Sequence, residues 1–235
     1  MRKSAGAGLA VVAMLAGAAR ADDASPAPAQ IARLRTDNSA IVVQDKDTAG
    51  VFEVQDDGTI KHRQSGLICP ARYPNAAFFH ALVYDAGKGL DVGCDYKRPD
   101  DKGGANAKLT IFVTKVADGA SVDAEFAKRR AEVAQTYPEA KSQGPALTIT
   151  QESKAALPDV RTEEFLIWMN ERDYTTQLIV AVSKGWSIEI RATFSGKPNE
   201  IALNAGSTTQ DAADAGGDRV MGAKALFDAL GTVGK

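Results

Sequence analysis

Three consecutive strand patterns joined by very short turns constrain the fold of this chain most. They cover residues 162–170, 174–183 and 186–194, and Lys184-Gly185 alone separates the last two. Apolar residues occupy every second position of the third pattern, which is typical of a strand with one buried face. Antiparallel neighbours can be joined by two-residue turns, whereas parallel strands need a long crossover. The sequence therefore predicts an antiparallel meander.

Shorter strand patterns precede the meander. Asp57-Gly58 lies between two of them, and this dipeptide favours a hairpin because glycine tolerates the positive φ of the turn. The expected strands are 51–54, 59–62, 67–69, 78–85, 90–97, 108–116 and a short one at 146–151.

Two helices are expected among these strands. The first covers 122–137, with Ser121 as its N-cap and a proline after it. The second begins at Asp218, after an exposed loop at 207–217, and has an apolar stripe that ends near Leu230. We expect an α+β fold: a mostly antiparallel β-sheet of short strands packed by two main helices in an α/β/α-type sandwich, forming one domain over residues 49–235.

The order of these elements resembles the Mog1/PsbP-like α+β family. The likeness lies in the 122–137 helix and in the meander after it, which ends in Gly185-Trp186-Ser187-Ile188-Glu189-Ile190. It covers roughly two thirds of the chain and implies a non-catalytic accessory or binding role, but no site residues, because one fold hosts many functions. The N-terminal hairpin and the two cysteines depart from the family pattern.

The N-terminus has the organisation of a cleavable signal peptide. Arg2 and Lys3 precede a small apolar stretch at 6–17, and an Ala-x-Ala pattern ends at Ala21. This stretch is too short to span a bilayer of about 30 Å. We therefore expect residues 1–21 to be removed between Ala21 and Asp22.

The expected mature protein begins with a flexible lead-in at 22–48, rich in Ala, Asp and Pro. Removal of three basic residues and no acidic ones would change the net charge from −2 to −5. This charge gives no basis for nucleic-acid binding, and no later segment is long and apolar enough for stable membrane insertion. We expect a periplasmic protein, with secretion beyond the periplasm as the alternative.

Cys69 and Cys94 are the only cysteines. In an oxidising compartment such a pair is most simply one disulfide, worth about 3 kcal/mol for a loop of this length. Each cysteine also lies in phase with apolar neighbours on its expected strand. A redox pair would need closer spacing, and a zinc site that adds His62 and His80 would match no close-paired zinc pattern.

No sequence motif indicates catalysis, a cofactor or a metal. The leading hypothesis is a protein-interaction or accessory module that binds another envelope protein. The alternatives are a carrier of a small apolar or amphipathic ligand in a sheet–helix pocket, and an enzyme with a scattered site. The residues expected to form a ligand or partner face are Phe112, Phe126, Trp168 and Trp186.

Overall fold

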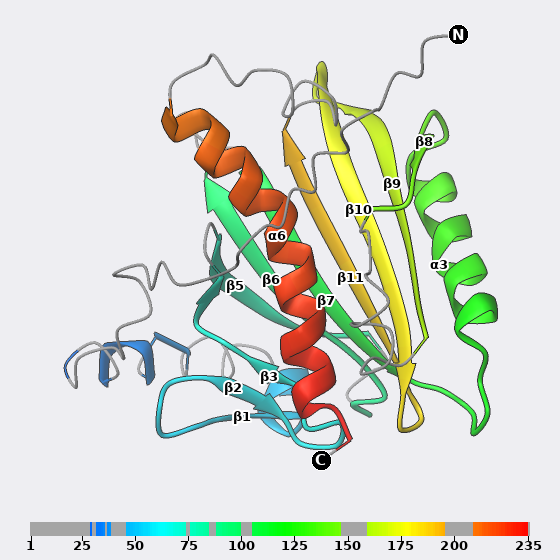
Figure 1. Cartoon of the computed structure of the whole chain (residues 1–235). Helices are drawn as coiled ribbons and strands as arrows, with labels where there is room; N and C mark the ends of the chain where they lie inside the picture. Colours follow the sequence, from blue (N-terminus) through cyan, green and yellow to red (C-terminus); the bar gives the residue numbers. More distant parts are fainter. Residues whose placement is uncertain are drawn as a thin grey trace, which may run out of the picture.

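The computed structural model describes residues 29, 32–35, 37–38, 46–73, 76–84, 88–99, 105–146, 159–195 and 209–234. Figure 1 shows a large twisted sheet, a small sheet below it, and two long helices. The expected signal peptide at 1–21 and most of the lead-in at 22–48 lie outside the described residues. In the part of the chain described, no helix has both the length and the apolar character needed to cross a membrane.

The large sheet has eight strands in the order β4-β5-β6-β7-β11-β10-β9-β8, and its neighbours pair antiparallel. The predicted meander is confirmed. Lys184 and Gly185 have φ of 50° and 76°, so both residues of this turn adopt the left-handed conformation of a tight hairpin. The strands are β4 (Arg72–Tyr73), β5 (Ala76–Val83), β6 (Asp91–Pro99), β7 (Ala105–Lys115), β8 (Lys141–Gly144), β9 (Val160–Met169), β10 (Arg172–Ser183) and β11 (Trp186–Ser195).

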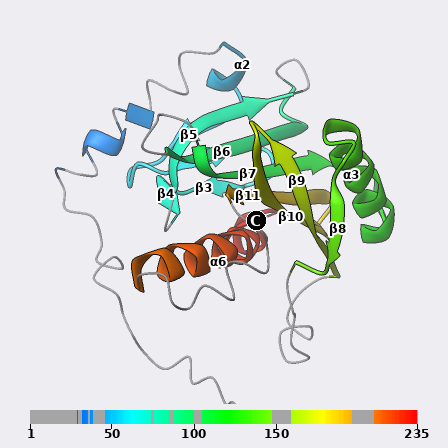
Figure 2. The same ribbon diagram turned by 90° about the horizontal axis from the view of Figure 1, so that it is seen from above.

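Helices α3 (Val122–Thr136) and α6 (Thr209–Thr232) cover opposite faces of this sheet (Figure 2). The alternation along β10 shows which face each helix covers. Leu178 and Val180 belong to the apolar cluster under α3, whereas Ile179 and Ala181 belong to the cluster that contains α6. The predicted α+β sandwich is therefore confirmed.

A second sheet contains β1 (Phe52–Val54), β2 (Ile60–His62) and β3 (Ile68–Cys69), preceded by the short helix α2 (Lys46–Ala49). Its apolar side chains join the core on the α6 side of the large sheet. The predicted disulfide is confirmed: Cys69 of β3 is bonded to Cys94 of β6, with a Cα–Cα distance of 6.3 Å. This bond ties the small sheet to the large one.

One local prediction was wrong, and one strand was missed. Helix α6 begins at Thr209 rather than Asp218, so part of the expected loop at 207–217 is helical. The composition of this segment, which is rich in Ser, Thr, Asp and Gly, favoured a loop, but each glycine costs only about 1 kcal/mol in a helix, and extending an existing helix is easier than starting one. Strand β8 was not predicted, and the strand expected at 146–151 lies, apart from Ala146, outside the described residues.

Candidate functional site

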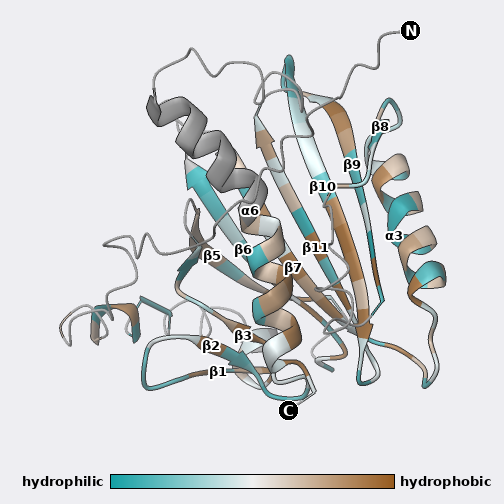
Figure 3. Ribbon diagram, viewed as in Figure 1, coloured by the Kyte–Doolittle hydropathy of each residue, from teal (hydrophilic) through white to brown (hydrophobic). Residues whose placement is uncertain are grey.

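Helix α3 contributes a buried charge to the sheet that it covers. Its inward stripe runs through Val122, Phe126 and Val133, and Arg129 lies on the same stripe at helical spacing. The Arg129 side chain is only 9% exposed. Figure 3 shows that α3 carries many hydrophilic positions, whereas the central strands and the lower half of α6 are more hydrophobic. Charged contacts therefore contribute to the docking of α3.

Arg129 belongs to a closed arginine–glutamate network of four residues. Arg129 Nε lies 3.2 Å from Glu189 Oε2, and its Nη1 donates to Glu132 Oε1 at 3.1 Å. Arg191 pairs with Glu189 on the same strand and donates through Nη2 to Glu132 at 2.9 Å. Each arginine thus contacts both glutamates, and the network joins α3 to β11.

Two further strands contact this network. Arg129 Nη2 donates to the Thr114 hydroxyl of β7 at 2.9 Å. The Thr114 hydroxyl in turn donates to Asp91 Oδ1 of β6 at 2.8 Å. A continuous line of polar contacts therefore runs from α3 across the sheet to Asp91.

Burial and neighbouring charges shift the pKa values of Glu189 and Arg129 in the network. Burial raises the pKa of Glu189, and the nearby Arg191 and Arg129 lower it only in part. Burial lowers the pKa of Arg129, but Glu189, Glu132 and Asp91 together raise it by more. The charge of Arg129 is therefore stabilised in the fold. Both Glu189 oxygens already contact guanidinium groups, and its side chain is 2% exposed, so this arrangement does not present it as a general base.

A small depression opens beside the network, and we call it the Tyr84 pocket. Its volume is about 160 Å³. Tyr84 and Phe112 form its aromatic side, with ring centroids 5.8 Å apart. The lining residues are Tyr84, Asp91, Phe112, Arg129, Glu132, Glu189 and Arg191.

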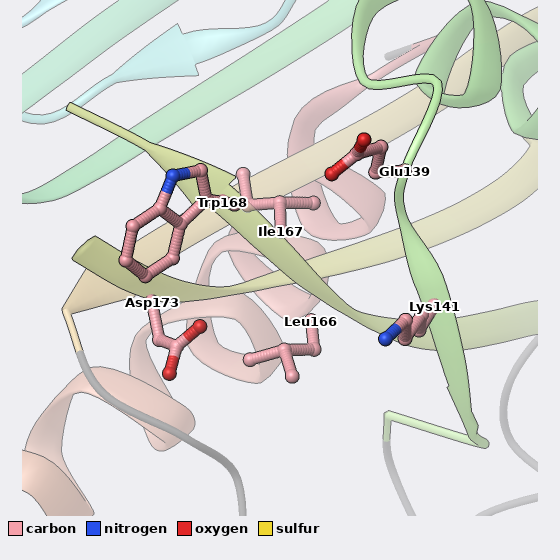
Figure 4. A pocket seen from close by; sticks show the side chains of 6 residues that line it. All are labelled: Glu139, Lys141, Leu166, Ile167, Trp168 and Asp173. Atoms are coloured by element: carbon pink, nitrogen blue, oxygen red, sulfur yellow. The ribbon is translucent and has the colours of Figure 1, made fainter. Parts of the chain in front are cut away.

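A larger depression lies toward the β8 edge of the sheet, and we call it the Trp168 pocket. Its volume is about 350 Å³. Figure 4 shows Trp168 and Leu166 on β9, Asp173 on β10, and Lys141 across from them on β8. Trp168 is 59% exposed, an unusual state for the largest apolar side chain. The lining residues are Glu139, Lys141, Leu166, Ile167, Trp168 and Asp173.

The four residues expected to form one ligand or partner face do not share a surface. Trp186 is buried in the α6-side core, and Phe126 packs in the cluster under α3. Phe112 lies on the α3 side of the sheet in the Tyr84 pocket, and Trp168 lies in its own pocket. Whether Phe112 or Trp168 contacts a ligand or partner stays a prediction.

The sequence reasoning missed Arg129 and Glu132, which form half of the network. A signal was present, because an arginine within the apolar stripe of an amphipathic helix must find a buried partner. Glu189 and Arg191 alternate with the apolar residues of β11, a pattern that by itself favours cross-strand ion pairs on an outer face. They pair instead with each other along β11 and with α3.

Comparisons with known proteins find a weak, fold-level resemblance. A mutant of the protein Mog1 is 9% identical, with a TM-score of 0.36 over 68% of this chain and 95% of that one. A Pseudomonas aeruginosa protein of unknown function, described as a candidate regulator, is 12% identical, with a TM-score of 0.29 over 61% of this chain and 85% of that one. No family model and no curated protein match the chain.

Proposed function

We propose that this protein is a non-catalytic binding module of the bacterial cell envelope that captures another envelope protein through the Trp168 pocket. The disulfide between Cys69 and Cys94 is compatible with an extracytoplasmic compartment, where thiols are readily oxidised. Residues 1–21 would direct export as a signal peptide and be removed from the exported chain. The single observation that carries the binding proposal is the exposure of Trp168.

Trp168 has the properties of an interface anchor. Tryptophan is enriched among residues that dominate binding energy, and such residues work best when a partner covers them fully. Covering the exposed part of this ring would contribute about 3 kcal/mol at about 25 cal/mol per Å². The pocket also contains Glu139, Lys141 and Asp173, and charges of both signs can orient a partner.

The carrier hypothesis has less support. It requires one apolar pocket lined by Phe112, Phe126 and Trp186. Phe112 and Trp186 lie on opposite sides of the sheet, so they cannot line a common cavity. The Tyr84 pocket contains Phe112 but also five charged residues.

Export is tested by sequencing the N-terminus of the protein recovered from the native periplasm. A chain that begins at Asp22 would support the proposal. A periplasmic chain that retains Arg2 and Lys3 would contradict cleavage, and a protein confined to the cytoplasm would contradict export.

Binding is tested by photo-crosslinking in the living cell. A photoreactive residue placed at Lys141, on the rim of the pocket, should capture a defined envelope protein that the same residue at Phe227 does not capture. Phe227 is a suitable control because it is 52% exposed on α6. Identical products at both positions, or none at Lys141, would contradict the proposal.

The captured partner is then purified and titrated against two variants. Trp168→Ala should weaken binding by about 30-fold, as expected for a residue that dominates an interface. Phe227→Ala should leave the affinity unchanged, and both variants should keep the melting temperature of the wild type. Equal effects of the two substitutions would mean that Trp168 is not the anchor.

A further inference from the structure

The aromatic side of the Tyr84 pocket lies over Gly93 of the neighbouring strand. A Cβ placed on Gly93 of β6 would lie 3.5 Å from Phe112 Cδ1 and 3.6 Å from Tyr84 Cε2. Both distances are those of ordinary van der Waals contact, so the two rings lie against the strand at Gly93; the closest approach of such a Cβ would be 3.1 Å, to the backbone oxygen of Ile111. Tyr84 remains 51% exposed, so this aromatic side is open to a ligand.

The charges that line the pocket do not cancel. Its two guanidinium groups face three carboxylates, so the lining carries a net charge of −1 when all five groups are ionised. Arg129 and Arg191 are occupied with Glu132 and Glu189. Asp91 accepts the Thr114 hydroxyl and contributes to raising the pKa of Arg129, but among the described residues it forms no close ion pair. One positive charge would therefore complete the site.

The electrostatic environment of Tyr84 agrees with the excess of negative charge in the pocket lining. Burial is the largest cause that raises the pKa of the phenol, followed by the carboxylates of Asp95 and Asp91. Arg191 opposes them, and Glu189 adds to them. A cation beside the ring would meet an excess of negative charge.

The aromatic side already accepts a cation from the protein itself. The Arg191 guanidinium lies 5.4 Å from the centroid of the Phe112 ring, within the range of a cation–π contact. Aromatic rings combined with a carboxylate are the usual recognition elements for organic ammonium ions. A divalent metal ion would instead require several oxygen ligands around one point.

We propose that the Tyr84 pocket binds one small organic cation, an alkylammonium group of the size of choline. Asp91 supplies the counter-charge, and Tyr84 and Phe112 contact the alkyl groups. An anion is disfavoured by the net negative charge of the lining, and a neutral ligand would leave that charge uncompensated. This site lies on the α3 side of the sheet and is separate from the Trp168 pocket.

The test is a titration of the full mature chain with choline at constant ionic strength. Binding is monitored by the chemical shifts of the backbone amides and by calorimetry. The control ligand is 3,3-dimethylbutan-1-ol, which has the shape of choline but no positive charge. We expect saturable choline binding with shifts at Gly93 and Thr114, and much weaker binding of the isostere. Absence of saturable binding at a large molar excess, or equal binding of the isostere, would overturn the proposal.

Variants assign the binding to this pocket. Asp91→Asn should weaken choline binding at least about tenfold, and Phe112→Leu, which keeps every charge, should weaken it by a similar factor. The matched control is Asp56→Asn, which removes an exposed carboxylate from the turn between β1 and β2 and should have no effect. Melting temperatures show that each variant is folded. Wild-type affinity in both pocket variants would overturn the assignment.

The ammonium group could come from a free molecule or from a lipid headgroup. A second arm therefore offers phosphatidylcholine vesicles to the wild type and to Asp91→Asn. Co-sedimentation that depends on Asp91 would identify the headgroup as the source. Choline binding without co-sedimentation would identify a free cation. Both results support the proposed site.

Discussion

Arg129→Met should destabilise the protein strongly, because it leaves Glu189 as a buried charge with a single cationic partner. Methionine keeps the apolar stem of the arginine in the stripe of α3 while it removes the charge. Both side chains are nearly inaccessible, with 9% and 2% exposed. Removing one partner from such a buried pair typically costs about 3–5 kcal/mol. For a domain of this size the melting temperature should fall by roughly 6–20 °C.

The assay is urea unfolding at neutral pH, with two companion variants. Arg161→Met makes the same substitution in the ion pair between β9 and Asp123 of α3, whose side chains are 41% and 69% exposed. Water already solvates that pair, so its loss should cost less than about 1 kcal/mol. The double variant Arg129→Met/Glu189→Gln should recover most of the lost stability, since it removes the stranded charge as well.

The pH dependence gives an independent check. The folded-state pKa of Glu189 already lies above its ordinary value of 4.5, and loss of Arg129 would raise it further. Between the ordinary pKa of 4.5 and the higher folded-state pKa, Glu189 binds a proton in the folded state but not in the unfolded state. Folding therefore becomes more favourable as the pH falls through this interval. The cost of Arg129→Met relative to wild type should therefore shrink from neutral pH toward 4.5. Equal costs for Arg129→Met and Arg161→Met, or no recovery in the double variant, would refute the reasoning.

Two further predictions concern the α6 side of the sheet. Replacing Cys69 and Cys94 by alanine should lower the free energy of unfolding by about 3 kcal/mol, because the disulfide closes a loop with a sequence separation of 25. The measurement is urea unfolding, and an unchanged midpoint would contradict a stabilising role of the disulfide between the small and large sheets. Gly222→Leu should cost about 1–3 kcal/mol, because a Cβ there would already lie 3.0 Å from Gln177 Oε1. Gly231→Leu on the same helix is the control, since no atom lies within 4 Å of its added Cβ, and equal melting temperatures of the two variants would contradict this account.

Local patterns determined most of the elements. The meander was predictable because alternation and two-residue turns act between neighbours in sequence, and α3 because a cap, an apolar stripe and a proline coincide. The disulfide was predictable because the chain offers only one pair of cysteines. The start of α6 was not predictable in this way, because the loop-forming residues at 209–217 are tolerated inside a helix that is already formed.

The candidate sites depend on register and on the pairing of distant strands. Strand β7 pairs with β11, which lies far along the chain, and this pairing places Thr114 and Phe112 beside Glu189. Helix α3 then adds Arg129 and Glu132 from a third region. A shift of one residue in any of these strands would turn the charged side chains to the other face.

The sequence by itself determined most of the secondary structure, the antiparallel arrangement and the cysteine pair, because each follows from neighbours in the chain or from composition. Only the tertiary structure decided which face each helix covers, that Phe112 and Trp186 lie on opposite sides, and that Trp168 remains exposed. Those outcomes depend on how strands distant in sequence align, and the free energy of that alignment is distributed over the whole core.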